Sequence, residues 1–251
     1  PDFGQVESDD LVVNFSAIET FLTEKRPFFT QNQQLFDLRT TLDGRLVNTR
    51  RIGAAPDAGP EGETDVLAAA KYSITHADWE YGIFAAAEDD SVQASGRDYF
   101  VARLRRHGEG WSAGYLGTHA NRPTIDRTAT VHSLDAEYSP APGWAFRGEA
   151  IVTDAREPAA GPAMRGAGAW LAALYAPGGR IEQNLHASWY DDTYDINDLG
   201  FMERNNIRVF QSETFLYRRS YPSEVICNRV AGISTRTGGR RMPAGACHPG
   251  S

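Results

Sequence analysis

Apolar and polar residues alternate along residues 66–190, in repeated segments of similar length. In 79–88, Trp79, Tyr81 and Ile83 share one parity, while Glu80 and Glu88 share the other. A period of two sends such sets to opposite faces of a β-sheet. The pattern predicts eight strands, at 66–75, 79–88, 98–106, 111–119, 129–138, 144–153, 166–176 and 180–190. The chain also allows two further strands, at 44–52 and 206–217.

The lengths of these strands and of their links favour an antiparallel up-and-down meander in a transmembrane β-barrel. A tilted strand needs about 9–11 residues to cross a bilayer, and the predicted strands have that length. Short and long links alternate, a pattern typical of outer-membrane barrels. The short links are 76–78, 107–110, 139–143 and 177–179, and the long ones are 89–97, 120–128, 154–165 and 191–205.

Tryptophan placement adds a third indication. Trp79, Trp111 and Trp144 each occupy the first strand position after a short link, and Trp189 precedes a long one. Amphipathic rings prefer the headgroup level of a membrane, so we predict that these four are interface aromatics. The alternative is that they form the core of a soluble β-sandwich.

One predicted strand breaks the rule. In 166–176, Trp170 and Leu174 lie opposite Leu171 and Tyr175, which gives this strand two apolar faces. The alternation does not explain it.

Residues 1–65 show no confident strand period. A helix is an alternative for residues 12–22, Pro27 would end a helix, and the Pro- and Gly-rich stretch 53–64 is a loop. We therefore divide the chain into three parts. These are an entry or plug-like segment with a first strand (1–65), the barrel wall (66–235) and an unrelated or disordered tail (236–251).

Composition narrows the choice of partners. The 251 residues hold 25 Lys and Arg against 33 Asp and Glu, a net charge of −8 that argues against a nucleic-acid partner. Mean hydropathy is −0.45, and the apolar runs are too short for a transmembrane helix. The first residues lack the features of a signal peptide, so we expect the chain to have lost one or to begin within a longer protein.

The polar parity of the strands carries both signs of charge. We predict a hydrated interior, partly filled by residues 1–40, in which facing strands pair their charges across the lumen. The bland alternative is a solvent-exposed face. The lumen-facing candidates are Lys71, Arg103, Arg105, Asp135, Glu137, Arg147, Glu149, Glu182 and His186.

The chemistry-bearing clusters are weak. Asp191, Asp192, Asp195 and Asp198 could offer oxygen ligands to calcium, but the glycine and closing glutamate of a helix–loop–helix calcium site are absent, so a solvated loop is favoured. Residues 24–29 suggest an interfacial anchor or a plug rather than a reactive cluster. No catalytic, phosphate-binding or dinucleotide motif is present, so no catalytic residue and no cofactor is assigned.

Several short motifs resemble one bacterial family. They are Pro1-Asp2-Phe3-Gly4-Gln5-Val6-Glu7-Ser8-Asp9, Glu24-Lys25-Arg26-Pro27-Phe28-Phe29, Asn32, Leu35-Phe36-Asp37, Arg50-Arg51-Ile52-Gly53 and Leu199-Gly200-Phe201-Met202-Glu203-Arg204-Asn205. The chain resembles, over about residues 1–235, the domain of unknown function that follows a family-nine-like carbohydrate-binding domain in outer-membrane proteins.

The resemblance implies an outer-membrane β-barrel of a Gram-negative bacterium, with the lipid bilayer as partner. It also implies uptake or surface handling of carbohydrate through an upstream domain that this chain lacks. Family barrels are longer, so we expect a partial barrel of about 8–10 strands. Two alternatives stay open: a surface-displayed hydrolase, and a soluble β-sandwich or lipocalin-like ligand-binding protein.

Overall fold

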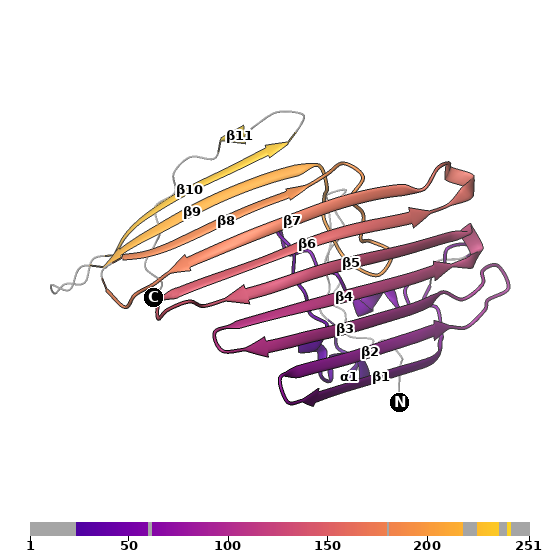
Figure 1. The fold of residues 1–251 in the computed structure, drawn as a ribbon. Helices are drawn as coiled ribbons and strands as arrows, with labels where there is room; N and C mark the ends of the chain where they lie inside the picture. The colour runs from indigo at the N-terminus through magenta and orange to yellow at the C-terminus, as the bar shows by residue number, and fades with distance from the viewer. Residues whose placement is uncertain (1–23, 60–61, 180, 218–224, 236–239, 242–251) are drawn as a thin grey trace.

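The computed structural model describes residues 24–59, 62–179, 181–217, 225–235 and 240–241. Within these residues one antiparallel sheet holds 11 strands in chain order, each hydrogen-bonded to the next (Figure 1). The strands are β1 Val66–His76, β2 Trp79–Glu88, β3 Asp98–Gly108, β4 Trp111–Arg122, β5 Arg127–Tyr138, β6 Trp144–Arg156, β7 Met164–Tyr175, β8 Ile181–Tyr190, β9 Ile207–Tyr217, β10 Val225–Thr235 and β11 Arg240–Arg241.

The all-β, up-and-down meander is confirmed. All eight strands predicted from the alternation are present, and the further strand at 206–217 is β9. The sheet is open, because among the described residues β1 pairs with β2 alone. The predicted helix alternative at 12–22 lies outside the described residues, as does most of the predicted tail. No helix in the described part of the chain is long and apolar enough to span a membrane.

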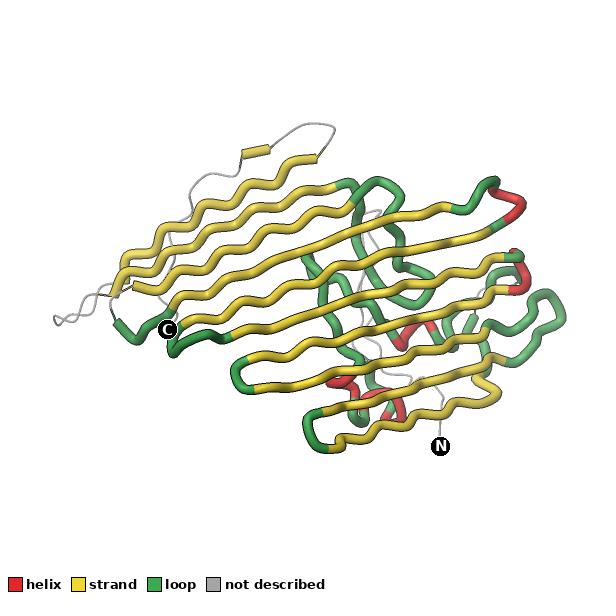
Figure 2. Tube along the Cα trace, in the orientation of Figure 1, coloured by secondary structure: helices red, strands yellow, loops and turns green. Residues whose placement is uncertain are grey.

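In the part of the chain that the structure describes, helical structure is limited to short turns, coloured red in Figure 2. They are α1 Pro27–Thr30 and the 3₁₀-helices Gln33–Leu35, Thr49–Arg51, Pro123–Ile125 and Pro158–Ala160.

The strand allowed at 44–52 is wrong. Arg45 forms only isolated bridges to Arg39 and Phe201, and a 3₁₀-helix follows at Thr49–Arg51. Leu46 and Val47 are both buried, although they are consecutive. A half-buried strand buries alternate residues. Here two consecutive residues are buried, because the segment lies between the sheet and the long link 191–206.

The long link predicted at 120–128 is also wrong, because β4 and β5 continue to Arg122 and from Arg127. Asn121 pairs with Thr128, and Arg122 pairs with Arg127. All four side chains are polar, whichever face of the sheet they point to. The sequence therefore shows no alternation of apolar and polar residues there that would predict a strand. The links at one end of the sheet are 77–78, 109–110, 139–143 and 176–180, and those at the other are 89–97, 123–126, 157–163 and 191–206. We call these ends the short-link end and the long-link end.

One face of the sheet is crossed by residues 24–58, which lie behind the strands in Figure 1. We call it the covered face, and the opposite one the open face. Phe29, Phe36, Leu46 and Ile52 of this segment are buried in the hydrophobic core. Their partners on the covered face lie in the long-link half of the strands: Phe84, Ala86, Tyr99, Val101, Leu116, Ala120, Val131, Ile151, Tyr190, Ile207 and Val209. The core therefore occupies half of the covered face.

Gly82 of β2 lets this segment pack closely against the sheet. A Cβ atom at Gly82 would lie 2.6 Å from Leu35 Cδ2 and 2.6 Å from Phe36 Cζ. The absence of a side chain lets both residues lie directly against the strand.

The position of Trp170 in β7 now has an explanation. Trp170 lies on the covered face, where its indole Nε1 donates a 2.7 Å hydrogen bond to Glu149 Oε2. Gly166 and Gly168 share that face, and Cβ atoms there would collide with Tyr194 and Tyr190. On the covered face, β7 thus contributes a hydrogen-bond donor and two glycines that leave room for tyrosine rings. On the open face it contributes Leu171.

Candidate functional site

All nine polar candidates lie on the covered face. The register shows this, because directly opposed residues project to the same side of a sheet. Arg103 opposes Gly82, which contacts Leu35 and Phe36, and Asp135 opposes Glu149. Whether this face encloses a lumen stays a prediction. The nine are Lys71 of β1, Arg103 and Arg105 of β3, Asp135 and Glu137 of β5, Arg147 and Glu149 of β6, and Glu182 and His186 of β8.

Among the nine candidates, the tightest charge pair is between Arg103 and Asp135. Two hydrogen bonds, of 2.5 and 3.0 Å, join the guanidinium to the carboxylate. Bidentate pairs of this kind are the strongest that side chains form. The arginine side chain is only 3% exposed, so the pair neutralises a charge that is almost fully removed from solvent.

A second, more exposed group follows toward the short-link end. Glu137 accepts from Arg105 Nη2 at 3.4 Å and pairs with Arg147 Nε at 3.0 Å. Ser112 Oγ takes a further bond from Arg105 Nη2 at 3.0 Å. These pairs join neighbouring or next-neighbouring strands. The sequence analysis expected pairs between strands that face each other across an interior, and these pairs are not of that kind.

Glu149 is buried in the middle of this face. Ser133 Oγ donates to Oε1 at 2.6 Å, and Trp170 Nε1 donates to Oε2 at 2.7 Å. Each carboxylate oxygen therefore has a donor, which offsets the cost of burying the group.

Two of the candidates hold the N-terminal segment. Lys71 Nζ donates to the carbonyl oxygens of Phe28, at 2.7 Å, and of Gln31, at the end of α1. His186 Nε2 lies 3.1 Å from Thr41 Oγ1, at the far side of the sheet. The segment is thus tied to both β1 and β8.

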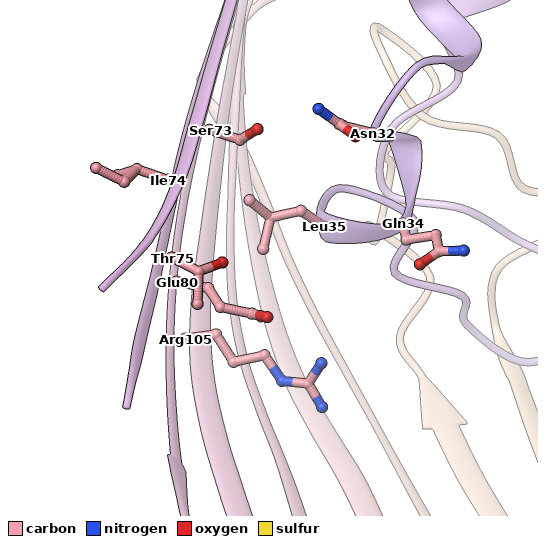
Figure 3. A pocket seen from close by; sticks show the side chains of 8 residues that line it. All are labelled: Asn32, Gln34, Leu35, Ser73, Ile74, Thr75, Glu80 and Arg105. Carbon is pink, nitrogen blue, oxygen red and sulfur yellow. The ribbon is translucent and has the colours of Figure 1, made fainter. Parts of the chain in front are cut away.

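A cleft of about 390 Å³ lies between this segment and the sheet. Figure 3 shows the side chains of Asn32, Gln34 and Leu35 on one wall, opposite those of Ser73, Thr75, Glu80 and Arg105. Arg105 Nε is buried without a hydrogen-bond partner among the described residues. Such a lining can bind a small polar molecule. Ile74 borders the cleft but points to the open face (Figure 3).

An ion network that sequence reasoning missed closes the long-link end. Arg97 binds Glu88 at 2.5 Å and approaches Asp57 at 3.7 Å, and Arg122 binds Asp57 at 2.6 Å. The Asp57 and Glu88 side chains are almost fully buried. Asp57 and Arg97 belong to links with no periodic signal, so nothing in the pattern brought them together.

Asp198 extends the network, and arginines rather than a metal cation neutralise its carboxylate. Arg127 binds its carboxylate at 2.8 and 2.7 Å, and Arg122 does so at 3.0 Å. Burial raises the pKa of Asp198, but the hydrogen bonds and charges of the two arginines lower it more, so the pKa lies below its usual range. Asp195 also binds Arg127, and Asp191 accepts from the amides of Ala167 and Thr193. Among the described residues no group of three or more His, Cys, Asp or Glu could hold a metal ion.

The Glu24-Lys25-Arg26 motif is structural at its outer members. Arg26 is buried and binds Glu24 at 2.8 and 2.7 Å, the Ile52 carbonyl at 2.8 Å and the Thr49 carbonyl at 2.7 Å. Burial raises the pKa of the Glu24 carboxyl, but hydrogen bonds from Arg26 and Thr49 lower it below its ordinary value. The arrangement fits a packed segment.

The four tryptophans occupy the places that the sequence predicted. Trp79, Trp111 and Trp144 begin β2, β4 and β6 at the short-link end, and Trp189 lies near the end of β8. All four project from the open face. Trp144 packs against Tyr175 at 4.4 Å and Phe146 at 5.7 Å between ring centroids.

The comparisons with known proteins identify similarity at one end of the chain. A family model described as a domain of unknown function (DUF5916) matches residues 1–86. No curated protein and no solved structure matches the chain. The matched range contains the segment that crosses the covered face, β1 and most of β2. The resemblance to a domain of unknown function is thereby confirmed for these residues.

Proposed function

We propose that this chain forms part of the wall of a β-barrel in the outer membrane of a Gram-negative bacterium. The observation that carries the proposal is the open face, where large apolar side chains are exposed from β1 to β9. Leu134 is 63% exposed and Leu171 is 58% exposed, both within strands. Contiguous apolar surface of this extent is rare on soluble monomers. The other such residues are Tyr72, Ile74, Tyr81, Ile83, Phe100, Trp111, Tyr138, Trp144, Val152, Ile181, Leu185, Trp189, Phe210 and Leu216.

The distribution of charge on this face supports lipid contact. Among the described residues of β1–β9, charged side chains on the open face lie near strand ends. At the long-link end these are Asp98, Asp154, Arg156, Arg165 and Arg208, and at the short-link end Arg106. Charged side chains are tolerated near the interfaces and costly at the midplane.

One polar pair within the apolar band is matched internally. Tyr115 OH and His132 Nδ1 lie 2.7 Å apart on the open face. A polar group that faces hydrocarbon needs such a partner, because lipid offers none.

The strands also have the required length, since β1–β9 contain 10 to 13 residues each. The charged face, in contrast, is paired and half covered by residues 24–58. We infer that it faces an enclosed space that this segment fills at the long-link end. A role in uptake or surface handling of carbohydrate rests on the family resemblance.

Fractionation of the full-length protein tests the proposal. We expect it to stay in urea-washed outer membranes and to show heat-modifiable migration on a denaturing gel. Recovery from the aqueous fraction would instead support the soluble sandwich or lipocalin-like alternative.

Thiol labelling tests the enclosed space separately. A cysteine at Arg147 on the covered face should resist an impermeant reagent in membranes and react after unfolding in detergent. Equal labelling in both states would show that the covered face is open to solvent.

A further inference from the structure

We propose that Arg106, Trp79 and Trp111 form a binding site for the phosphate of a phospholipid headgroup at the short-link end of the open face. The proposal rests on the membrane location proposed above and adds a ligand to it. The three residues belong to adjacent strands, β3, β2 and β4.

The register brings the three side chains to one place. Trp79 lies directly opposite Arg106 on the neighbouring strand. Trp111 lies directly opposite Gly108, which is two residues beyond Arg106 on the same face. The site therefore spans three strands at the level where the short links begin.

Gly108 seats the second indole. A Cβ atom at Gly108 would collide with Nε1 and Cε2 of Trp111, so the ring lies across the glycine and over β3. Any larger residue at 108 would displace the ring.

The guanidinium is flanked by both rings. Arg106 Cζ lies 5.2 Å from the centroid of the Trp79 ring and 5.9 Å from that of the Trp111 ring. Both distances are within the range of cation–π attraction, which holds the cation in place without using its N–H groups.

Those N–H groups have no partner among the described residues. The adjacent arginine is different, because Arg105 on the covered face binds Ser112 and Glu137. A planar guanidinium with unused donors matches the oxygens of a phosphate group, which it can bind through two parallel hydrogen bonds. Among the described residues of β1–β9, Arg106 is the charged side chain of the open face at the short-link end, and no carboxylate pairs with it, which favours an external anion.

The headgroup of a bilayer lipid is the source of phosphate that fits this position. Indole rings gather at the headgroup level, where phosphates lie. Arginine stems extend along apolar surface so that the charge reaches that level. The site thus sits where a membrane would present its anions.

Lipid retention by the full-length protein in dodecyl maltoside tests the site. Dioleoylphosphatidylglycerol is titrated in, and bound lipid is counted by native mass spectrometry. We expect Arg106→Gln to weaken binding about tenfold, the loss of roughly one charge-assisted hydrogen bond. Trp79→Leu should weaken it as well. Arg165→Gln is the matched control, because Arg165 lies on the same face but already binds Asp154 at 2.9 Å.

The outcomes separate the site from the membrane proposal. Equal retention by wild type and Arg106→Gln would overturn the site, even if the protein stays in washed membranes. Failure of the wild type to stay in those membranes would overturn the proposed function, whatever the retention in detergent shows. If millimolar sodium phosphate displaces the lipid from wild type, the site binds free phosphate and the assignment to a headgroup is wrong.

Discussion

The guanidinium of Arg103 reaches the carboxylate of Asp135 by passing over Gly114, across the intervening strand β4. A Cβ atom at Gly114 would lie 2.6 Å from Arg103 Nη1 and 2.7 Å from Nη2. The absence of a side chain at Gly114 therefore leaves room for the ion pair. The pair links β3 to β5 across β4.

Gly114→Ala should break this pair. The methyl group would push the guanidinium aside and leave two poorly solvated charges, at a cost of about 2–4 kcal/mol in the free energy of unfolding. A urea titration in detergent micelles measures it. In an Asp135→Asn background the same alanine should cost much less, because the pair is already lost. Equal costs in both backgrounds would show that the glycine matters for another reason.

Gly82→Ala should release the segment that covers the sheet. The added methyl would meet Leu35 and Phe36, and the Phe36 ring is buried, so residues 33–36 must move away from β2. Limited proteolysis should then cut the variant faster than wild type between residues 30 and 45. Ala85→Val on the open face of the same strand is the control and should leave the cleavage rate unchanged.

Trp170→Phe should destabilise the protein by about 1–3 kcal/mol, because a buried Glu149 oxygen would lose its donor. The phenyl ring replaces most of the indole, so packing changes little. Trp144→Phe is the comparison, since the Trp144 indole has ring contacts but its N–H group has no hydrogen-bond partner among the described residues. A larger loss for Trp144→Phe than for Trp170→Phe would remove the role given to the Glu149 contact.

The sequence predicted the sheet well because strand parity is a local signal. Each strand between 66 and 190 except the one at 166–176 carries its own alternation, and the first residue after three of the four short links is a tryptophan, at Trp79, Trp111 and Trp144. Sheet order then follows from short links, which force neighbours in sequence to be neighbours in space.

The contacts of the covering segment escaped prediction because they are not local. Beyond its neighbour Glu24, Arg26 donates to the carbonyl oxygens of residues 49 and 52, and Thr41 contacts His186 across 145 positions of sequence. The edge network has the same character, since Arg122 joins links that contain Asp57 and Asp198. Contacts between residues so far apart in the sequence cannot be predicted from the charge of a residue and the face of its strand alone.

Trp170 of β7 shows where the alternation of apolar and polar residues fails to predict which face a side chain occupies. Trp170 looked like an error in the alternation because an indole was counted as apolar. Its N–H group makes it a polar partner for Glu149, and this role needs the register between β6 and β7.

Acid should loosen the long-link end through Asp198. Its pKa is lowered in the folded state, so the stabilisation is present above the ordinary aspartate value of about 4 and is lost as pH falls through the lower folded value. Protease sensitivity of residues 191–206 should rise below about pH 4 in wild type. Asp198→Asn should show raised sensitivity already at pH 7. Glu203→Gln, a change at an exposed residue of the same link, should behave as wild type at every pH.

A charge in the middle of the open face distinguishes lipid from water around this sheet. Leu171 is 58% exposed, so Leu171→Arg in a soluble protein should change stability by no more than about 0.5 kcal/mol. At the midplane of a bilayer the same substitution costs about 2–4 kcal/mol. We therefore expect Leu171→Arg to reduce the folded, heat-modifiable form in membranes. Val92→Arg is the control, because Val92 is 95% exposed in a long link. If both variants fold and fractionate as wild type does, the open face contacts water and the barrel-wall proposal fails.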